Sequence, residues 1–278
     1  GITPTLQGFN AVAIGSGAGA NKQDQRGTAI GDSAGQISQG DSSIAVGYQA
    51  GNNNQGQLSV ALGATAGASY QGASSIGVGY GSGKNHQSEY SISLGYLAAY
   101  DYQGTRALAI GNEAGKTYQG DNTIAVGSLS GYYYQGDNSV ALGPLTGYYR
   151  QGANSVAIGT YAGSNKLGYG SIAIGYNAAK NSANVTLPNN SILICATESE
   201  RNPIYANSFY ICPVRVSNVN MTYGLGYTTD MEVVKFDVTS VPASSSATGY
   251  NGQWAGDANY FYWYAGGQWN RVAKDSTW

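Results

Sequence analysis

The sequence predicts an all-β protein whose main part is a parallel β-solenoid, and a strict internal repeat is the first reason. A glycine recurs every 16 residues, and an aliphatic residue precedes it each time. No insertion or deletion interrupts the pattern between the first of these glycines and the last. A short period held this strictly is typical of a solenoid, in which each coil contacts only its neighbours. The eleven glycines are Gly15, Gly31, Gly47, Gly63, Gly79, Gly95, Gly111, Gly127, Gly143, Gly159 and Gly175.

The composition agrees with a structural protein. The 278 residues include 42 glycines and 24 tyrosines, but only 13 Lys and Arg, 15 Asp and Glu and one His. So few charges do not suit a disordered tail and are unusual for a metabolic enzyme. The net charge of −2 gives no electrostatic reason to expect a nucleic-acid partner. No apolar run approaches the ~18 residues of a membrane helix, so no membrane insertion is expected.

Each coil is expected to contain a strand, a turn, a second short strand and a turn. The stretch "SIAVG" alternates, which places Ile44 and Val46 on one face of the strand and Ala45 on the other. β-branched residues favour a strand, and each glycine inside a helix would cost about 1 kcal/mol. We expect the aliphatic pairs to point inward and to fill a thin core.

With the aliphatic pairs inside, the alanine between them would point outward in most coils. A small apolar residue in the same outward position of successive coils has no reason to face water, but it suits a close contact between subunits. Cyclic symmetry fits a strip that contacts itself, so a homotrimer is expected. The predicted interface residues are Ala45, Ala61, Ala109, Ala125, Ala141 and Ala157.

Four segments follow from where the repeat begins and ends. Residues 1–10 are expected to cap the first coil, and residues 11–188 to form the solenoid of eleven coils. Near its end, Ser191 replaces the expected glycine and the motif returns four residues late as "SILIC". Residues 189–245 are predicted to be an extended β connector, or neck. Residues 246–278 hold all four tryptophans and are predicted to form a small, aromatic-rich β module.

The repeats resemble those of known surface proteins. "SVALG", "SVAIG" and "SIAIGYNA" are similar to the head repeats of YadA-type trimeric autotransporter adhesins. The longer form, with "AG", "QG" and "SIAIG" in each period, is more similar to fibre proteins of tailed phages and large DNA viruses. Three later segments also resemble parts of such virion proteins: "NSILICATESERNPIYANSFYICPVRV" (190–216), "YGLGYTTDMEVVKF" (223–236) and "GQWAGDANYFYWYAGGQWNRVA" (252–273).

The resemblance implies a left-handed parallel β-roll and a homotrimer. In the viral version, the trimer is a rigid fibre or spike on the virion surface. It would join the virion base or another fibre protein through its N-terminus, and it would attach to a glycan or protein on the host surface. The alternative is the head of an adhesin on a bacterial cell surface, which would continue into a coiled-coil stalk and a membrane anchor.

A column of tyrosines is the first candidate for a receptor contact. Tyr102, Tyr118 and Tyr134 each stand seven residues after the repeated glycine, in a turn expected to face solvent. Stacked one coil apart, their rings would lie about 5 Å from one another along an edge of the rod. Two interpretations remain open. The rings either protect the edge by stacking, or they form a surface for a sugar or a protein.

The C-terminal aromatic run is the second candidate. "NYFYWYAGGQWNRV" alternates tyrosines with Phe261 and Trp263, so one set should face inward and the other outward. We expect Phe261 and Trp263 to be buried and the tyrosines to be exposed at the tip; the alternative is that these aromatic residues form a trimer core. The candidate receptor residues are Tyr260, Tyr262, Tyr264 and Trp269.

The other polar residues are assigned structural roles. A glutamine recurs in nine consecutive coils, from Gln23 to Gln151, and predicts a ladder of side-chain amides. Asp121 and Asp137 are assigned to solvated turns rather than to a calcium site or a glycosidase pair. His86 has no second histidine and no nucleophile motif beside it, and is assigned to a turn. We therefore expect no catalytic residue, no metal, no cofactor and no enzyme activity.

Two cysteines, Cys195 and Cys212, each lie in an apolar run. They are too few for a disulfide framework, so we expect buried free thiols. A disulfide between the two is the alternative.

Overall fold

The computed structural model describes residues 7–180, 188–195, 206–212, 223–227, 233–237, 254–256, 260–265 and 267–273. Within these ranges the regular structure consists of strands, with no helix. The chain divides into two compact units, Gly1–Pro213 and Val214–Trp278.

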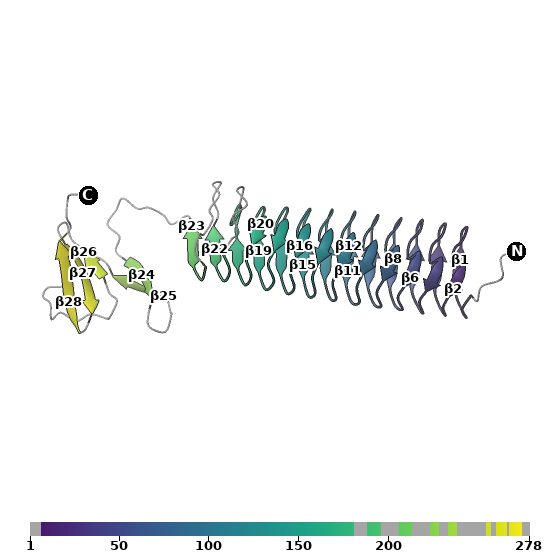
Figure 1. The fold of residues 1–278 in the computed structure, drawn as a ribbon, viewed down its shortest axis with the longest axis horizontal. Helices are drawn as coiled ribbons and strands as arrows, with labels where there is room; N and C mark the ends of the chain where they lie inside the picture. The colour runs from purple at the N-terminus through teal and green to yellow at the C-terminus, as the bar shows by residue number, and fades with distance from the viewer. Residues whose placement is uncertain are drawn as a thin grey trace. The chain divides into compact units, whose positions relative to one another are not determined.

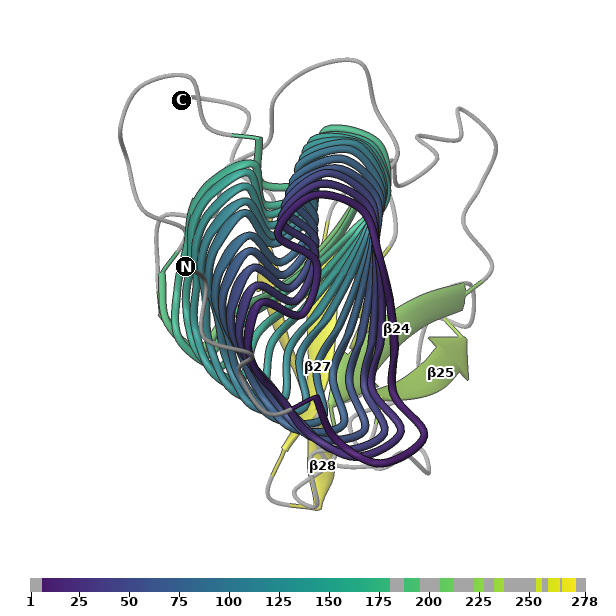
Figure 2. The ribbon, with the colours of Figure 1, turned by 90° about the vertical axis from the view of Figure 1, so that its right-hand side faces the viewer.

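The first unit is a parallel β-solenoid with the predicted repeat (Figure 1). Each regular coil contributes one strand to each of two sheets. A residue pairs with its equivalent 16 positions away, as Ala109 does with Ala125. Viewed along the rod, successive coils follow nearly the same path behind one another (Figure 2). Side chains of one column therefore stack at the spacing of neighbouring β-strands, about 4.8 Å.

The first sheet, the aliphatic sheet, has 13 parallel strands: β1 (Val12–Ile14), β3 (Thr28–Ile30), β5 (Ile44–Val46), β7 (Val60–Leu62), β9 (Ile76–Val78), β11 (Ile92–Leu94), β13 (Leu108–Ile110), β15 (Ile124–Val126), β17 (Val140–Leu142), β19 (Val156–Ile158), β21 (Ile172–Ile174), β22 (Ile192–Cys195) and β23 (Phe209–Cys212). The second, the tyrosine sheet, has ten parallel strands: β2 (Asn21–Gln23), β4 (Ile37–Gln39), β6 (Asn53–Gln55), β8 (Ser69–Gln71), β10 (Asn85–Gln87), β12 (Asp101–Gln103), β14 (Thr117–Gln119), β16 (Tyr133–Gln135), β18 (Tyr149–Gln151) and β20 (Asn165–Leu167).

Alanine, rather than the aliphatic pairs, fills the interior of the rod. In β15 the side chain of Ala125 is 0% exposed, whereas Ile124 is 36% exposed. A second alanine column, three residues after the repeated glycine, is also buried and packs against the first. The expected inside–outside assignment is therefore wrong by one residue throughout the solenoid. The predicted subunit interface fails with it, because these residues are fully buried within a single chain: Ala45, Ala61, Ala109, Ala125, Ala141 and Ala157.

The physical reason is the narrowness of the coil. The amide Nε2 of Gln119, in β14, donates a hydrogen bond of 2.8 Å to the backbone carbonyl of Leu108, in β13. One side chain therefore spans the interior from sheet to sheet. The remaining space fits methyl groups, and a larger aliphatic side chain would overpack it. Strand alternation then turns every isoleucine, valine and leucine of the motif outward.

The glutamine ladder is present, and it does more than predicted. Coil-to-coil bonds of 3.2 Å join Gln55 to Gln71, Gln71 to Gln87, and Gln103 to Gln119. From Gln23 to Gln151, each of the nine amides also donates to a carbonyl of the aliphatic sheet. The column thus links the two sheets as well as neighbouring coils.

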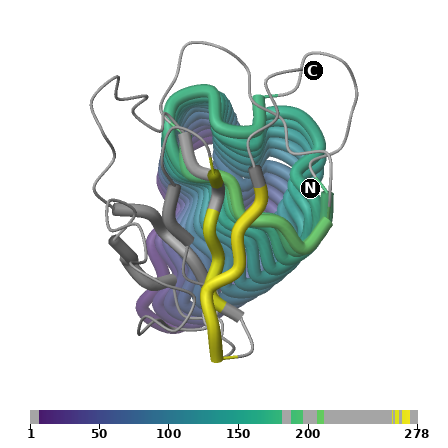
Figure 3. Tube along the Cα trace, turned by 90° about the vertical axis from the view of Figure 1, so that its left-hand side faces the viewer, coloured from purple at the N-terminus to yellow at the C-terminus, as the bar shows by residue number. Residues whose placement is uncertain are grey.

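The four-residue shift near the end of the repeat is confirmed, since Ile172 pairs with Ile192. The aliphatic sheet then continues through β22 and β23, inside the segment expected to be a connector (Figure 3). Leu193 occupies the alanine column and is only 1% exposed. At this level of the rod a leucine thus replaces the alanine of the regular coils in the interior.

Cys195 is disulfide-bonded and buried. It lies in register with Cys212, the only other cysteine of the sequence, on the neighbouring strand. The expectation of free thiols is therefore wrong, because adjacent parallel strands bring the two residues side by side. Disulfides form and persist in oxidising surroundings and are rare in a reducing cytosol.

Reducing this disulfide should destabilise the C-terminal end of the rod by about 3 kcal/mol, because the bond closes a short loop in the unfolded chain. Urea unfolding with and without dithiothreitol measures the difference. A Cys195→Ser/Cys212→Ser variant should be equally destabilised and should no longer respond to dithiothreitol. Identical unfolding of the intact protein with and without reductant would contradict the expectation.

The described residues of the second unit form two small antiparallel sheets. The strands β24 (Tyr223–Tyr227) and β25 (Val233–Asp237) form one of them. The other has β27 (Tyr260–Ala265) in the middle, between β26 (Trp254–Gly256) and β28 (Gln268–Ala273).

Candidate functional site

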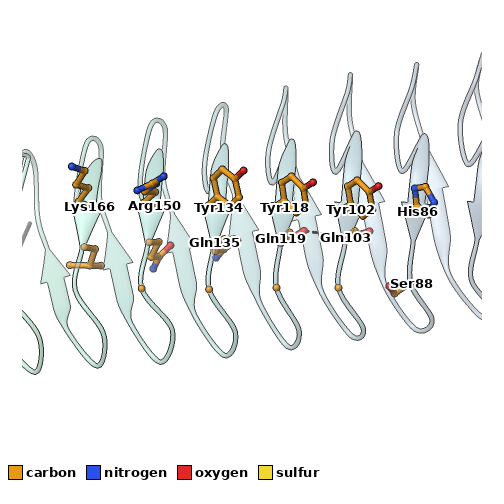
Figure 4. Close-up of a pocket in the computed structure, with 16 residues that line it drawn as sticks. His86, Ser88, Tyr102, Gln103, Tyr118, Gln119, Tyr134, Gln135, Arg150 and Lys166 are labelled. Atoms are coloured by element: carbon orange, nitrogen blue, oxygen red, sulfur yellow. Dashed lines mark hydrogen bonds between the residues drawn. The ribbon is translucent and has the colours of Figure 1, made fainter. Parts of the chain in front are cut away.

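The predicted tyrosine stack exists and is longer than expected. The rings of Tyr102 and Tyr118 are parallel to within 2° with centroids 4.9 Å apart, and those of Tyr118 and Tyr134 repeat this geometry at 5.0 Å. The imidazole of His86 stacks on Tyr102 at 4.7 Å, and Tyr70 stacks on His86 at 5.1 Å. These five residues form the ring column, most of which Figure 4 shows. His86 therefore takes part in an aromatic stack, a role that its sequence position alone did not show.

The local structure explains why the rings face outward. Tyr118 is the middle residue of β14, and the next residue, Gln119, points into the interior. Alternation therefore directs Tyr118 away from the rod, where it is 44% exposed. Its φ of 54° is in the left-handed region, which bulky residues rarely adopt. The same is true of Tyr102 and Tyr134.

A groove with a volume of about 830 Å³ runs beside the ring column. Buried glutamines and the glycines that follow them form part of its lining. Six successive coils each add one more residue, at the position that the ring column occupies. Because these glycines have no side chain, the backbone forms part of the groove wall. Four of these six residues belong to the ring column and two are cations at the equivalent position of the next coils: His86, Tyr102, Tyr118, Tyr134, Arg150 and Lys166.

Two cations continue the column at the C-terminal end of the groove. The guanidinium of Arg150 lies 5.9 Å from the ring centroid of Tyr134, and Lys166 follows one coil later. The salt bridges within the described ranges are Arg26–Asp41 and Lys116–Glu113. Neither Arg150 nor Lys166 is thus neutralised by a carboxylate of that part of the chain.

In a neighbouring column of lysines and tyrosines, Lys116 is paired with a carboxylate. Lys116 donates to Glu113 at 2.8 Å and to the hydroxyl of Tyr132 at 3.3 Å. Burial opposes the charged ammonium, but these hydrogen bonds leave the pKa of Lys116 above its usual value. Burial, with Tyr132 beside it, raises the pKa of the Tyr148 phenol. In this column Lys116 is thus paired within the chain, and Lys84 donates a 3.0 Å hydrogen bond to the hydroxyl of Tyr100.

The two stacked aspartates also have structural partners. Asp121 accepts a 2.8 Å hydrogen bond from the backbone amide of Thr105, and Asp137 accepts one of 3.0 Å from the amide of Asp121. Each carboxylate thus holds the turn of the preceding coil. Over the described ranges, no three His, Cys, Asp or Glu side chains lie close enough together to hold a metal ion.

The C-terminal candidates do not form the exposed tyrosine face that was expected. Tyr262 and Trp269 are 8% and 7% exposed, and Tyr260 and Tyr264 pack against them. Trp263 is partly buried, and the side chain of Phe261 lies outside the described residues. The pairing of β27 with β28 explains this outcome. Tyr264 pairs with Trp269, so the tyrosine face meets a tryptophan and becomes the small core.

An apolar face of the solenoid was missed by the sequence analysis. The outward residues of the aliphatic sheet form two columns along the rod, and exposure reaches 58% at Ile14 and 45% at Leu62. Contiguous exposed apolar surfaces are characteristic of interaction sites in proteins. The tyrosine sheet, which carries the groove, is a separate face of the rod.

Fold and surfaces together define a repetitive parallel β-rod with an apolar face on one sheet and a ring-lined groove on the other. The family described as the YadA head domain repeat matches the chain in two copies, at residues 7–34 and 151–178. Heads of this kind are trimeric in general and are exposed at the surface. No curated protein and no solved structure matched the chain. Among the described residues, no helix is long and apolar enough to cross a membrane.

Proposed function

We propose that the chain is the rigid rod of a trimeric attachment protein, without enzyme activity or cofactor, displayed on a virion or a cell and binding a host surface. The YadA head domain repeats carry this proposal, because they indicate an adhesin-like head. The unbroken coil-to-coil hydrogen bonding from β1 to β23 supports a stiff spacer. The disulfide-bonded Cys195 supports a location outside a reducing cytosol.

The trimer contact in this proposal is the outward face of the aliphatic sheet. Its side chains are apolar except at Thr28 in the regular coils β1 to β21, and they are partly or largely exposed in the single chain. A thin solenoid with an alanine interior buries little apolar area by itself, so covering this face adds stability that the lone chain lacks. Three rods packed through this face keep the tyrosine sheet on the outside.

Two settings fit the rod. In the first, which the sequence resemblance favours, it is a virion fibre or spike joined at its N-terminus to the virion base or to another fibre protein. The β-strands of residues 223–273 support this version, because an adhesin head would pass into a coiled-coil stalk. In the second, which the matched repeat supports, it is a bacterial adhesin head.

A glutamate at an outward aliphatic position should break the assembly and leave the single chain folded. Ile124→Glu together with Val140→Glu places six carboxylates in the apolar contact of a trimer, which should cost several kcal/mol, on the order of 1–3 per buried group. Multi-angle light scattering should show monomers, while the circular dichroism spectrum of the β-sheets is retained.

The matched control is Asn54→Glu, which adds a carboxylate to an exposed position on the tyrosine sheet. This variant should remain trimeric. If the Ile124/Val140 variant is as trimeric as the unmodified protein, the aliphatic sheet is not the contact face.

Attachment itself is tested with fluorescently labelled full-length protein on candidate host cells. Saturable binding that unlabelled protein competes away supports the function. Gold-labelled antibodies on particles and cells of the source then separate the two settings. Absence of saturable binding to every host tested, from protein shown to be trimeric, would contradict an attachment role.

A further inference from the structure

The groove beside the ring column remains open in the proposed trimer. It lies on the tyrosine sheet, and the residues proposed for the trimer contact lie on the aliphatic sheet. The groove extends over six successive coils, so its length is about 24 Å, five steps of the strand spacing. Its volume of about 830 Å³ is in the upper part of the range for ligand pockets. The shape fits a linear chain better than a compact molecule.

The backbone of the groove wall is not available for pairing with an added peptide strand. The amides of Gly104, Gly120, Gly136 and Gly152 already donate to carbonyls of the next coil, at 2.7–2.9 Å. Peptides that bind by strand addition need unpaired main-chain groups at a sheet edge. Recognition in this groove must therefore come from side chains: the aromatic rings, their hydroxyl groups and the cations.

The ring column has an apolar and a polar part in every coil. The flat faces of the stacked tyrosines cover one another, so a ligand in the groove meets apolar ring edges and hydroxyl groups that donate and accept hydrogen bonds. Sugars have the matching chemistry, with apolar C–H faces and hydroxyl groups on each pyranose ring. Centroid spacings of 4.9 and 5.0 Å between the tyrosines are close to the length of one sugar in a linear chain. Successive sugars can therefore meet successive rings.

Arg150 and Lys166 give the groove a charged end. Neither is paired with a carboxylate of the described residues, although the chain as a whole carries a net charge of −2. A guanidinium binds a carboxylate with two parallel hydrogen bonds, and an adjacent ammonium adds a third charge-assisted contact. The cations therefore favour a ligand that bears anionic groups, such as the carboxylates of acidic sugars.

The position that carries the rings has the same backbone conformation in every coil. Each tyrosine of the groove has a φ of 53–54°, and other residues at this position, such as Asn54 and Lys166, have a φ of 56°. The fold therefore fixes where these side chains leave the backbone, and the residue type decides what the groove offers a ligand.

We propose that this groove binds a linear acidic oligosaccharide, with its sugar rings along Tyr102, Tyr118 and Tyr134 and a carboxylate at Arg150 and Lys166. The inference rests on the proposed attachment function and specifies the chemical class of the receptor. No bond is made or broken in this site.

The test uses the full chain on an array of linear tetra- to hexasaccharides, with uronic-acid and sialic-acid members and neutral members of the same linkages. We expect binding to acidic members that weakens as salt is added. Tyr118→Asn should reduce affinity about tenfold, while asparagine keeps the backbone conformation favourable. Arg150→Gln and Lys166→Gln should each reduce affinity for acidic members about tenfold and leave neutral members unchanged.

Two matched controls separate the groove from the rest of the rod. Tyr80 and Tyr96 also form an exposed stacked pair but do not line the groove, so Tyr80→Asn should bind normally. Lys22 stands in the same column as Lys166 at the far end of the rod, so Lys22→Gln should also bind normally. Equal losses in the control and groove variants would overturn the proposal.

Further outcomes distinguish this inference from the attachment function. If the protein binds cells saturably but no acidic oligosaccharide, the attachment function stands and the acidic-glycan site is wrong. If an acidic peptide binds and Arg150→Gln abolishes that binding while oligosaccharides do not bind, the ligand class is wrong. If oligosaccharides bind and the Tyr118, Arg150 and Lys166 variants are affected as expected, the site is supported independently of cell attachment.

Discussion

Replacing Ala125 with glutamate should unfold the rod rather than merely dissociate it. Ala125 is 0% exposed and lies among other alanines between the two sheets. A glutamate there has neither room nor a partner for its carboxylate. The expected loss is about 4 kcal/mol or more, from overpacking together with a buried charge. Urea unfolding followed by circular dichroism measures it.

The neighbouring residue gives the control. Ile124→Glu changes the adjacent position of the same strand to the same residue, but the new side chain points outward. The isolated Ile124→Glu chain should be nearly as stable as the unmodified one, within about 1 kcal/mol. If Ala125→Glu remained folded and only changed the oligomeric state, alanine would be on the surface and the interior described above would be wrong.

Adding a methyl group to a repeated glycine should destabilise the rod almost as much as Ala125→Glu. Gly127 has a φ of 127°, and an added Cβ would lie 2.6 Å from the backbone carbon of Gly143 in the next coil. Backbone cannot move aside as a flexible side chain can, so neighbouring coils would have to separate. We expect Gly127→Ala to cost about 3 kcal/mol, measured as a shift of the unfolding midpoint in urea.

The same change four residues later is the matched control. At Gly131 the φ is 55°, and the added Cβ would meet the side chain of Gln135 at 2.7 Å rather than backbone. The sequence itself has alanine in this column, at Ala99 and Ala179, with the same sign of φ. Gly131→Ala should cost about 1 kcal/mol. Equal losses at the two glycines would show that coil spacing is not what the repeated glycine protects.

The sequence predicted the solenoid because its period is a direct property of the chain. Residues 16 apart must be equivalent, so strand pairs such as Ala109–Ala125 and the stacking of Tyr102, Tyr118 and Tyr134 followed from counting. Even the four-residue shift before Ile192 could be located in this way. These predictions need the repeat alone and no knowledge of which way a side chain points.

The pattern could not show which face of each strand points into the interior. Alternation states that Ile124 and Ala125 lie on opposite faces, but either face can be the inner one. The usual rule that larger apolar residues lie inside failed, because the width of the coil is set by a cross-interior hydrogen bond from Gln119. The glutamine that recurs from coil to coil was the feature of the sequence that could have indicated a narrow interior. From the sequence it was interpreted only as a ladder along the rod.

Predicting the groove and the disulfide also required knowledge of the folded chain, namely which side chains point inward and which strands are neighbours. The groove forms where a glycine follows the glutamine in consecutive coils, beside rings whose outward direction is a result of folding. Its position could not be predicted before the interior was known. The pairing of Cys195 required the strand register of β22 and β23, which lie beyond the regular repeat. In the second unit, the packing of Tyr262 required the partner strand that carries Trp269.

The disulfide also determines how the rod would respond to pulling. A tensile load on the C-terminal side of Cys212 would peel coils from that end, and each freed coil of 16 residues would lengthen the tether by about 50 Å at full extension. The sulfur–sulfur bond at Cys195 carries the load past the residues between the two cysteines, so that segment cannot unravel. A rod built in this way would lengthen only after the tension reached the regular coils, which would then unfold one at a time.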